Sequence, residues 1–313
     1  MAIEFNNKNY HVNWYPKENN SFRYTVIDNL FKESFRSELV SYFNKNLRDK
    51  LRRFPHYDCD VLCIDPKNKH PFNFVYSLEW KNFISNIFPD IPITNNIMAE
   101  IQHHHVGSKD GWIHNDYDAS HFVNDPVNNG INPWYYQCPY RQEEPNENLI
   151  TNVRSIAIIY YLNDQENWKE GDGGETALFD EGRNIPLSDY IMKTNPVPNR
   201  LFVYEINPFS FHSFLSNKKF ERTTIMMWYH TSAEDTNKRY GWYGEDFYKG
   251  VTDSDLQLMK KQWKGNDIKD LDTFSSMHYY CKHADRHIDL HQNVEHPYDH
   301  YCPENTNGKK RIK

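Results

Sequence analysis

The sequence predicts a mainly β core, built as a sandwich or a barrel, with helices packed around it. Between residues 97 and 229, short segments rich in β-branched and aromatic residues are separated by Gly, Pro, Asn and Asp. This alternation is typical of several strands joined by turns. Ahead of this region an apolar residue recurs at every fourth position, which indicates a helix.

Individual elements follow from the same patterns. A first strand over 22–28 ends at Asp28, which is a plausible N-cap for a helix of about six turns running to Leu51. Residues 76–88 and 253–264 show shorter helical patterns. The strands expected in the core are 97–106, 154–162, 176–179, 201–206 and 222–229.

The bulk composition excludes several classes of protein. A net charge of −7 argues against a nucleic-acid groove. No apolar run reaches the roughly 18 residues that suggest a membrane span, and residues 1–8 lack the features of a signal peptide. The five cysteines are odd in number and scattered, which indicates a reducing compartment, so we expect a cytoplasmic protein. The composition leaves the oligomeric state open.

His114 and Asp116 are the main candidate metal ligands, in the stretch Gly-Trp-Ile-His-Asn-Asp-Tyr-Asp. On a strand, residues two apart point to the same face, so both side chains could bind one metal ion. His212 on another strand would complete a set of two histidines and one carboxylate, which suits Fe(II) because it leaves positions open opposite the protein ligands. Arg222 offers a bidentate partner for a carboxylate bound beside the metal.

The pattern His-x-Asp alone has little weight, because it occurs four times in this sequence, beginning at residues 56, 114, 283 and 287. The copy at 114 is distinguished by the series of β segments that follows it. In the run His103-His104-His105, alternation along a strand separates the middle ring from the other two, and one of the three could line the pocket. His283, His287 and His291 have helical spacing, for which a solvated face is favoured over a second metal site.

Taken together, the span from about 97 to 230 resembles the Fe(II)/2-oxoglutarate-dependent oxygenases, specifically the prolyl 4-hydroxylase-like branch. The resemblance is carried by the His-x-Asp pair, Tyr-Tyr-Leu-Asn at 160–163, Gly-Gly-Glu-Thr-Ala-Leu-Phe at 173–179, and the later His and Arg. It implies a double-stranded β-helix (jelly roll), iron held by His114, Asp116 and His212, and 2-oxoglutarate and O2 as cosubstrates.

The resemblance also assigns two residues to 2-oxoglutarate. Arg222 would bind its distal carboxylate, and Tyr161 is a candidate to help hold it. The chain departs from the family at two places: many relatives have a Tyr where this chain reads His103–His105, and many prolyl hydroxylases have Lys in place of Arg222.

The expected activity is oxidation of an unactivated C–H bond in a small amino-acid-derived metabolite, by hydroxylation or oxidative ring closure. Kainoid-type cyclisation of an N-prenylated glutamate, a step of natural-product biosynthesis, is one such reaction. Halogenation is disfavoured because halogenating relatives lack the carboxylate that Asp116 provides here. The alternatives are a peptidyl-prolyl 4-hydroxylase and a jelly-roll binding module without catalysis, against which the intact ligand set argues.

Three parts are expected along the chain. Residues 1–96 would supply a strand and helices that support the core, 97–231 would form the catalytic core, and 232–313 a helical or irregular extension. The polar, proline-containing stretch 118–150 is too long for an ordinary connection and directly follows the metal pair, so we expect a lid over the site. A lid and an extension walling the pocket favour a small-molecule substrate.

Overall fold

The fold is known here from a computed structural model that describes part of the chain. The described residues are 3–240 without 16–21, 55–57, 68, 112, 115, 118, 124–125, 128–129, 134–148, 166, 180–185 and 208–209. The expected helix at 253–264 and the histidines at 283–291 therefore lie outside the described residues, as does a large part of the expected lid. Within them, no helix combines the length and the apolar character needed to cross a membrane.

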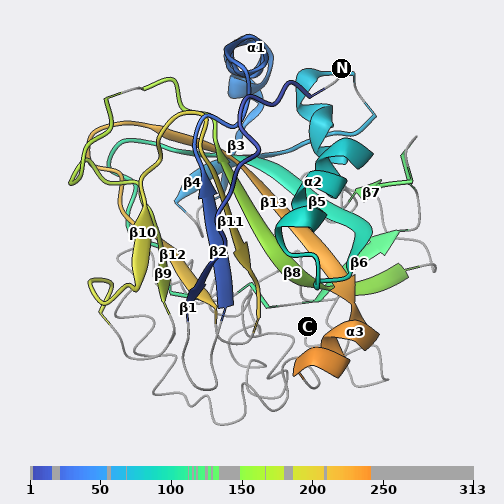
Figure 1. Ribbon diagram of the computed structural model, residues 1–313. Coiled ribbons are helices and arrows are strands. Elements are labelled where there is room, and N and C mark those ends of the chain that lie inside the picture. The colour runs from blue at the N-terminus through green and yellow to red at the C-terminus, as the bar shows by residue number, and fades with distance from the viewer. Residues whose placement is uncertain are drawn as a thin grey trace, which may run out of the picture.

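A large, almost entirely antiparallel sheet forms the body of the described structure (Figure 1). Its main path, in spatial order, runs through β1 (Asn13–Tyr15), β2 (Phe22–Ile27), β11 (Leu201–Glu205), β8 (Leu149–Tyr161), β13 (Arg222–Ser232), β5 (Ile93–His104), β4 (Cys59–Cys63) and β3 (Arg52–Phe54). Two further strands, β6 (Ala119–Val123) and β7 (Asn132–Pro133), pair with β8 and β5. The long central strands β8, β13 and β5 form the most extensive pairings.

A second sheet of three strands packs against one face of the large sheet. It contains β10 (Met192–Thr194), β9 (Thr176–Phe179) and β12 (Phe211–Phe214), in that order. Leu178 of β9 shares a buried cluster with Phe202, Tyr204 and Met226 of the large sheet. The prediction of a mainly β fold with flanking helices is confirmed, and the two facing sheets agree with the jelly-roll expectation.

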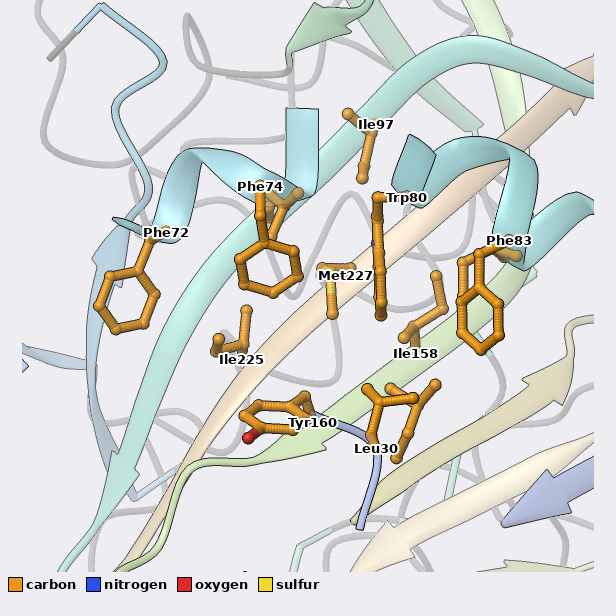
Figure 2. Close-up of a cluster of buried hydrophobic side chains, with 14 of the residues drawn as sticks. Leu30, Phe72, Phe74, Trp80, Phe83, Ile97, Ile158, Tyr160, Ile225 and Met227 are labelled. Carbon is orange, nitrogen blue, oxygen red and sulfur yellow. The ribbon is translucent and has the colours of Figure 1, made fainter. Parts of the chain in front are cut away.

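Helices cover the opposite face of the large sheet. They are α1 (Glu33–Tyr42) and α2 (Leu78–Ile87), with the 3-10 segment Pro71–Tyr76 between them in the chain. Figure 2 shows the aromatic side chains of Trp80 and Phe83 lying over Ile158 and Met227 of the sheet. Because side chains alternate along a strand, Ile156, Ile158 and Tyr160 of β8 face these helices, and their odd-numbered neighbours from Ala157 to Tyr161 face the small sheet.

The prediction of one continuous six-turn α-helix is wrong. The chain forms α1 only to Tyr42 and then continues as a π-helical segment, Phe43–Leu47, and a short 3-10 turn. Four residues turn an α-helix through about 400°, so a strict four-residue stripe drifts off the buried face by about 40° at each step. The wider π-helical turn offsets this drift, and both Phe43 and Leu47 remain buried.

Asp28 is not the N-cap of that helix. The residue before the helix is Lys32, whose side chain makes no capping hydrogen bond. The Asp28 carboxylate instead accepts two hydrogen bonds from Arg200, at 2.6 and 3.0 Å. This pairing, between residues far apart in the sequence, outweighs the local capping role that the sequence suggested.

The stretch expected to be an unstructured lid has strands at its ends. Ala119–Val123 pairs antiparallel with the beginning of β8, so β8 begins at Leu149 rather than at 154. The polar residues Ser120 and Asn152, which pair across these strands and are buried, hid this hairpin-like pairing from the hydrophobic pattern. The remainder, 134–148, lies outside the described residues, and the lid stays a prediction.

Strands β3, β4, β10 and β12 were not predicted, because each is short and lacks a clear alternation. β4 carries Cys59, a fully buried free cysteine, and Cys63, which is half-buried and disulfide-bonded. The disulfide does not fit the reducing compartment that we inferred from the number and spacing of the cysteines.

Candidate metal centre

The structure brings together the three residues that the sequence predicted as metal ligands. His114, Asp116 and His212 each place a potential ligand atom within 4.8 Å of the others. The Nε2 atom of His114 lies 3.7 Å from Asp116 Oδ1, and Nε2 of His212 lies 3.6 Å from Asp116 Oδ2. Asp116 and His212 are buried and His114 is half-buried.

His114 and Asp116 are not in a regular strand, contrary to the expectation. His114 forms a single antiparallel bridge with His212, in which each backbone N–H donates to the other residue's carbonyl, at 3.0 and 2.7 Å. His212 lies in β12, so the bridge ties the first ligand to the small sheet. The two histidine rings consequently lie side by side, with their centroids 4.2 Å apart.

Two side chains hold the Asp116 carboxylate in place. Trp228 Nε1 donates to Asp116 Oδ2 at 2.7 Å, and the Arg154 guanidinium donates to Oδ1 at 3.3 Å. Burial by itself raises the pKa of the Asp116 carboxyl, but His212, Arg154 and His114 and the hydrogen bond from Trp228 outweigh it and hold that pKa well below its usual range. Burial lowers the pKa of His212 to about 3. The cluster therefore offers an ionised carboxylate with a neutral imidazole of His212, the forms that bind metal ions.

Arg222 lies on the same inner face of the large sheet, at the start of β13. Its guanidinium is buried, lies 5.2 Å from the Phe214 ring centre and 5.3 Å from the Tyr161 ring centre, and donates from Nη2 to Thr176 Oγ1 at 3.0 Å. The Tyr161 hydroxyl shares the same Thr176 oxygen at 3.0 Å. The two residues predicted to bind 2-oxoglutarate thus meet at one threonine.

The Arg222 charge has no acidic partner among the described residues. Its Nε atom is buried without a hydrogen-bond partner, and burial lowers the pKa of the guanidinium. Nη1 faces Nδ1 of His104 at 3.4 Å, and burial, followed by the charge of Arg222, lowers the pKa of that histidine well below its usual value. An unpaired buried cation is costly unless an anion binds beside it.

A tight glycine turn positions Thr176. Gly173 and Gly174 have φ angles of +84° and +82°, in the left-handed region that disfavours other residues. A Cβ atom on Gly173 would lie 2.1 Å from the carbonyl oxygen of Ser216. The glycines quoted for the family resemblance therefore let the chain pass close to the end of β12 and enter β9 at Thr176.

Sequence reasoning missed three residues of this site and left a fourth among several candidates. Trp228 could have been found, because it lies an even number of residues after Arg222 in β13 and its side chain therefore points to the same face of the sheet. His104 was one of three candidates in the histidine run; the structure places its ring on Phe214, with centroids 4.0 Å apart. Thr176 and Arg154 gave no signal, since their roles depend on pairings between distant segments.

Comparison with known proteins agrees with this geometry. The family model for the 2OG-Fe(II) oxygenase superfamily matches residues 135–230, a span that includes His212 and Arg222 but begins after the His-x-Asp pair. The family match and the donor set together support a 2OG-Fe(II) oxygenase. The chain is therefore an iron-dependent dioxygenase that uses Fe(II), 2-oxoglutarate and O2, as the resemblance implied.

Solved structures that resemble the chain include several prolyl hydroxylases. A Pseudomonas putida prolyl-4-hydroxylase shares 15% identity with a TM-score of 0.45, over 66% of this chain and 92% of its own. A Trichoplax adhaerens prolyl hydroxylase, in complex with a hypoxia inducible factor peptide fragment, shares 15% identity with a TM-score of 0.46, over 69% and 86%. A viral collagen prolyl hydroxylase from Paramecium Bursaria Chlorella virus-1 shares 16% identity with a TM-score of 0.41, over 66% and 96%. The assignment rests on the family match and the donor set rather than on these similarities.

Proposed function

We propose that His114, Asp116 and His212 hold the catalytic Fe(II), and that Arg222 and Tyr161 bind 2-oxoglutarate beside it. The observation that carries this proposal is the buried Arg222 guanidinium, which has no acidic partner in the described part of the chain. A dicarboxylate bound to the metal by its keto-acid end would bring its distal carboxylate to such a cation.

The donor set fits the metal. Two imidazoles and one carboxylate occupy one face of the ion and leave the remaining positions for the cosubstrate and oxygen. The carboxylate is oriented by Trp228 and Arg154, as expected for a ligand that must keep one geometry. Bound there, Fe(II) supplies the oxidation of an unactivated C–H bond by O2, while 2-oxoglutarate is converted to succinate and CO2.

The protein's own residues have three tasks around that chemistry. His114, Asp116 and His212 fix the metal at the inner face of the large sheet. Arg222, with its charge concentrated in a buried site, fixes the orientation of the cosubstrate. Aromatic side chains, such as the half-buried Phe214 beside the guanidinium, restrict water around it.

For the substrate we propose a small amino-acid-derived metabolite, which the enzyme hydroxylates or closes oxidatively into a ring. Support comes from Arg154, whose guanidinium lies against the metal-side carboxylate and is only partly buried, at 18% side-chain exposure. A second cation beside the Asp116 carboxylate suits a substrate that carries carboxylates, such as an N-prenylated glutamate undergoing kainoid-type cyclisation in natural-product biosynthesis. The carboxylate of Asp116 disfavours halogenation, because it occupies the position that a halide would need.

Cosubstrate binding is tested without any substrate. Loaded with Fe(II) in the absence of oxygen, the protein should bind 2-oxoglutarate and develop a weak visible metal-to-ligand charge-transfer band. A His212→Ala variant is the control and should show no band. If the unsubstituted protein gives neither a band nor a calorimetric binding signal, the proposed roles of these residues are wrong.

Substrate class is tested by succinate release and mass spectrometry. Amino-acid-derived metabolites, including N-alkylated glutamates, should stimulate succinate release, with loss of two hydrogens for ring closure or gain of one oxygen for hydroxylation. Proline-rich peptides should not. Oxidation of a proline-rich peptide, with no small molecule accepted, would favour a peptidyl-prolyl 4-hydroxylase; absence of any turnover with Fe(II) bound would favour a binding module.

A further inference from the structure

A second cluster of metal-binding residue types lies where β5 ends and β13 begins. His103, His105 and Glu221 place potential ligand atoms within 4.8 Å of one another. His103 Nε2 is 3.7 Å from Glu221 Oε2, and His105 Nδ1 is 3.8 Å from Glu221 Oε1. The donor set, two imidazoles and one carboxylate, is the same as in the centre described above, and so is the spacing of the donors.

Each histidine of this cluster has one ring nitrogen engaged outside it. His103 Nδ1 hydrogen-bonds the Thr223 hydroxyl at 2.9 Å, and His105 Nε2 hydrogen-bonds the Asp60 carboxylate at 2.8 Å. A metal-binding histidine characteristically donates its second ring N–H to such an oxygen, which fixes the tautomer and the ring orientation. The nitrogens left over, Nε2 of His103 and Nδ1 of His105, are the two that face Glu221.

The free nitrogen of His103 is an unusual feature. The ring has only 2% side-chain exposure, and Nε2 is buried without a hydrogen-bond partner among the described residues. An unsatisfied buried ring nitrogen costs about 1–3 kcal/mol. Burial also lowers the pKa of His103 to about 4, so the ring is neutral at physiological pH and keeps a lone pair for a ligand.

Glu221 keeps coordinating capacity although it is paired. Arg48 Nη2 donates to Glu221 Oε2 at 2.5 Å, and both side chains are more than 40% exposed, at 44% and 42%. A carboxylate has about four lone-pair sites. Glu221 can therefore accept from Arg48 at Oε2 and still offer Oε1, the oxygen nearer to His105, to a cation.

The cluster is separate from the centre that holds His114. In the paired strands, Thr223 lies opposite His103 and Arg222 lies opposite His104. Alternation puts Arg222 and His104 on the inner face of the large sheet, whereas His103 and Thr223 belong to the helix-covered face. The His103 ring accordingly lies 6.3 Å from the Phe43 ring of the helical region.

We propose that His103, His105 and Glu221 form a second site for a divalent transition-metal ion, with zinc as its natural occupant. Two imidazoles and one carboxylate suit zinc, and donors bound at about 2.0–2.1 Å in tetrahedral geometry lie about 3.4 Å apart. The two histidine–glutamate distances, 3.7 and 3.8 Å, are already close to that separation. The ion would tie the end of β5 to the residue preceding Arg222. Its role is to stabilise the strand ends that carry the cosubstrate-binding arginine.

Zinc stoichiometry tests the proposal. The full-length protein is dialysed against buffered zinc, and bound metal per chain is measured by elemental analysis. His105→Ala and Glu221→Gln, both at exposed positions, should each bind one equivalent less than the unsubstituted protein. His11→Ala, at an exposed histidine outside the cluster, is the matched control and should bind the same amount. Because each variant is compared with the unsubstituted protein, zinc bound elsewhere on the chain contributes equally to both and does not affect the difference.

A second measurement separates this site from the iron centre. A His212→Ala background removes a proposed iron ligand, and adding His105→Ala to it should still lower the zinc content by one equivalent. In that background zinc should raise the melting temperature only while His105 and Glu221 are present. Equal zinc content in the presence and absence of His105 and Glu221 would overturn the proposal and leave the cluster as an ion pair, whereas the iron and 2-oxoglutarate tests would be unaffected.

Discussion

Replacing Arg222 with Met should change two properties of the protein in opposite directions. Arg222 donates to Thr176, but no described acidic residue neutralises its buried charge. Methionine fills a similar volume without a charge. We therefore expect the ligand-free protein to become more stable, while 2-oxoglutarate binding becomes much weaker.

The magnitudes follow from the burial of the guanidinium. Losing a buried charge-assisted pair with the distal carboxylate costs about 2–5 kcal/mol, which raises the dissociation constant of 2-oxoglutarate by about 30-fold to 5000-fold. Exchanging buried charge for a packed apolar group commonly raises the free energy of unfolding by about 1–4 kcal/mol. Thr176 keeps its hydrogen bond with Tyr161, so the substitution leaves no new unsatisfied hydroxyl.

The two effects are separated by denaturation with and without ligand. At a 2-oxoglutarate concentration of about 100 times its dissociation constant, binding stabilises the unsubstituted protein by about 2.7 kcal/mol. If the dissociation constant rises about 100-fold, the same concentration contributes only about 0.4 kcal/mol. Calorimetry in oxygen-free solution with Mn(II) in place of iron measures the dissociation constants directly.

Arg222→Lys is the matched control for this experiment. It keeps a positive charge but loses the bidentate geometry, so it should retain more 2-oxoglutarate binding than Arg222→Met. Unchanged affinity in Arg222→Met would refute the reasoning and move carboxylate binding to another residue. Loss of stability in ligand-free Arg222→Met would show that the guanidinium is neutralised by a group outside the described residues.

Three further outcomes are expected. His212→Ala should abolish turnover and leave the circular dichroism spectrum unchanged, because the site is built on a packed β scaffold; a lost native spectrum would contradict this. Trp228→Phe removes the hydrogen bond to Asp116 and should weaken metal binding by about 10-fold to 100-fold in calorimetry, with unaltered affinity as the contrary result. Burial lowers the pKa of His230 to about 3, whereas in the unfolded chain it is about 6.5. Below about pH 6.5 the unfolded chain therefore binds more protons than the folded protein, and the free energy of unfolding falls as the pH is lowered. Between pH 6.5 and 5.0 this histidine should contribute a loss of about 2 kcal/mol in chemical denaturation, which His230→Asn should remove.

The core strands could be predicted because each buried strand is itself a run of apolar residues. Thr176–Phe179 is reproduced residue for residue, and β8 and β13 were found from apolar runs. The beginning of β8 was less visible, because its pairing with β6 includes the buried polar residues Ser120 and Asn152. Short strands such as Phe211–Phe214 are stabilised by pairing with a neighbouring strand, and their own sequence is too short to show a period of two.

The metal-ligand cluster was predictable for a different reason, and only in part. His114, Asp116 and His212 were singled out by residue type and order, and the structure brings them within ligand distance. The expected local geometry was wrong, since one bridge rather than a strand holds His114. The supporting hydrogen bonds from Trp228 and Arg154 depend on which strands meet across the sandwich, and no local pattern encodes that.

The reciprocal hydrogen bonds between His114 and His212 have a consequence for how the enzyme acquires its metal. If His114 and His212 bind the iron as proposed, metal uptake need not close the loop between them, because backbone amides already join these residues across a long stretch of sequence. Affinity is then set by the donor atoms rather than by a coupled folding transition. Stripping the ion with a chelator should leave both amides slow in hydrogen exchange, and the emptied protein should reload without refolding.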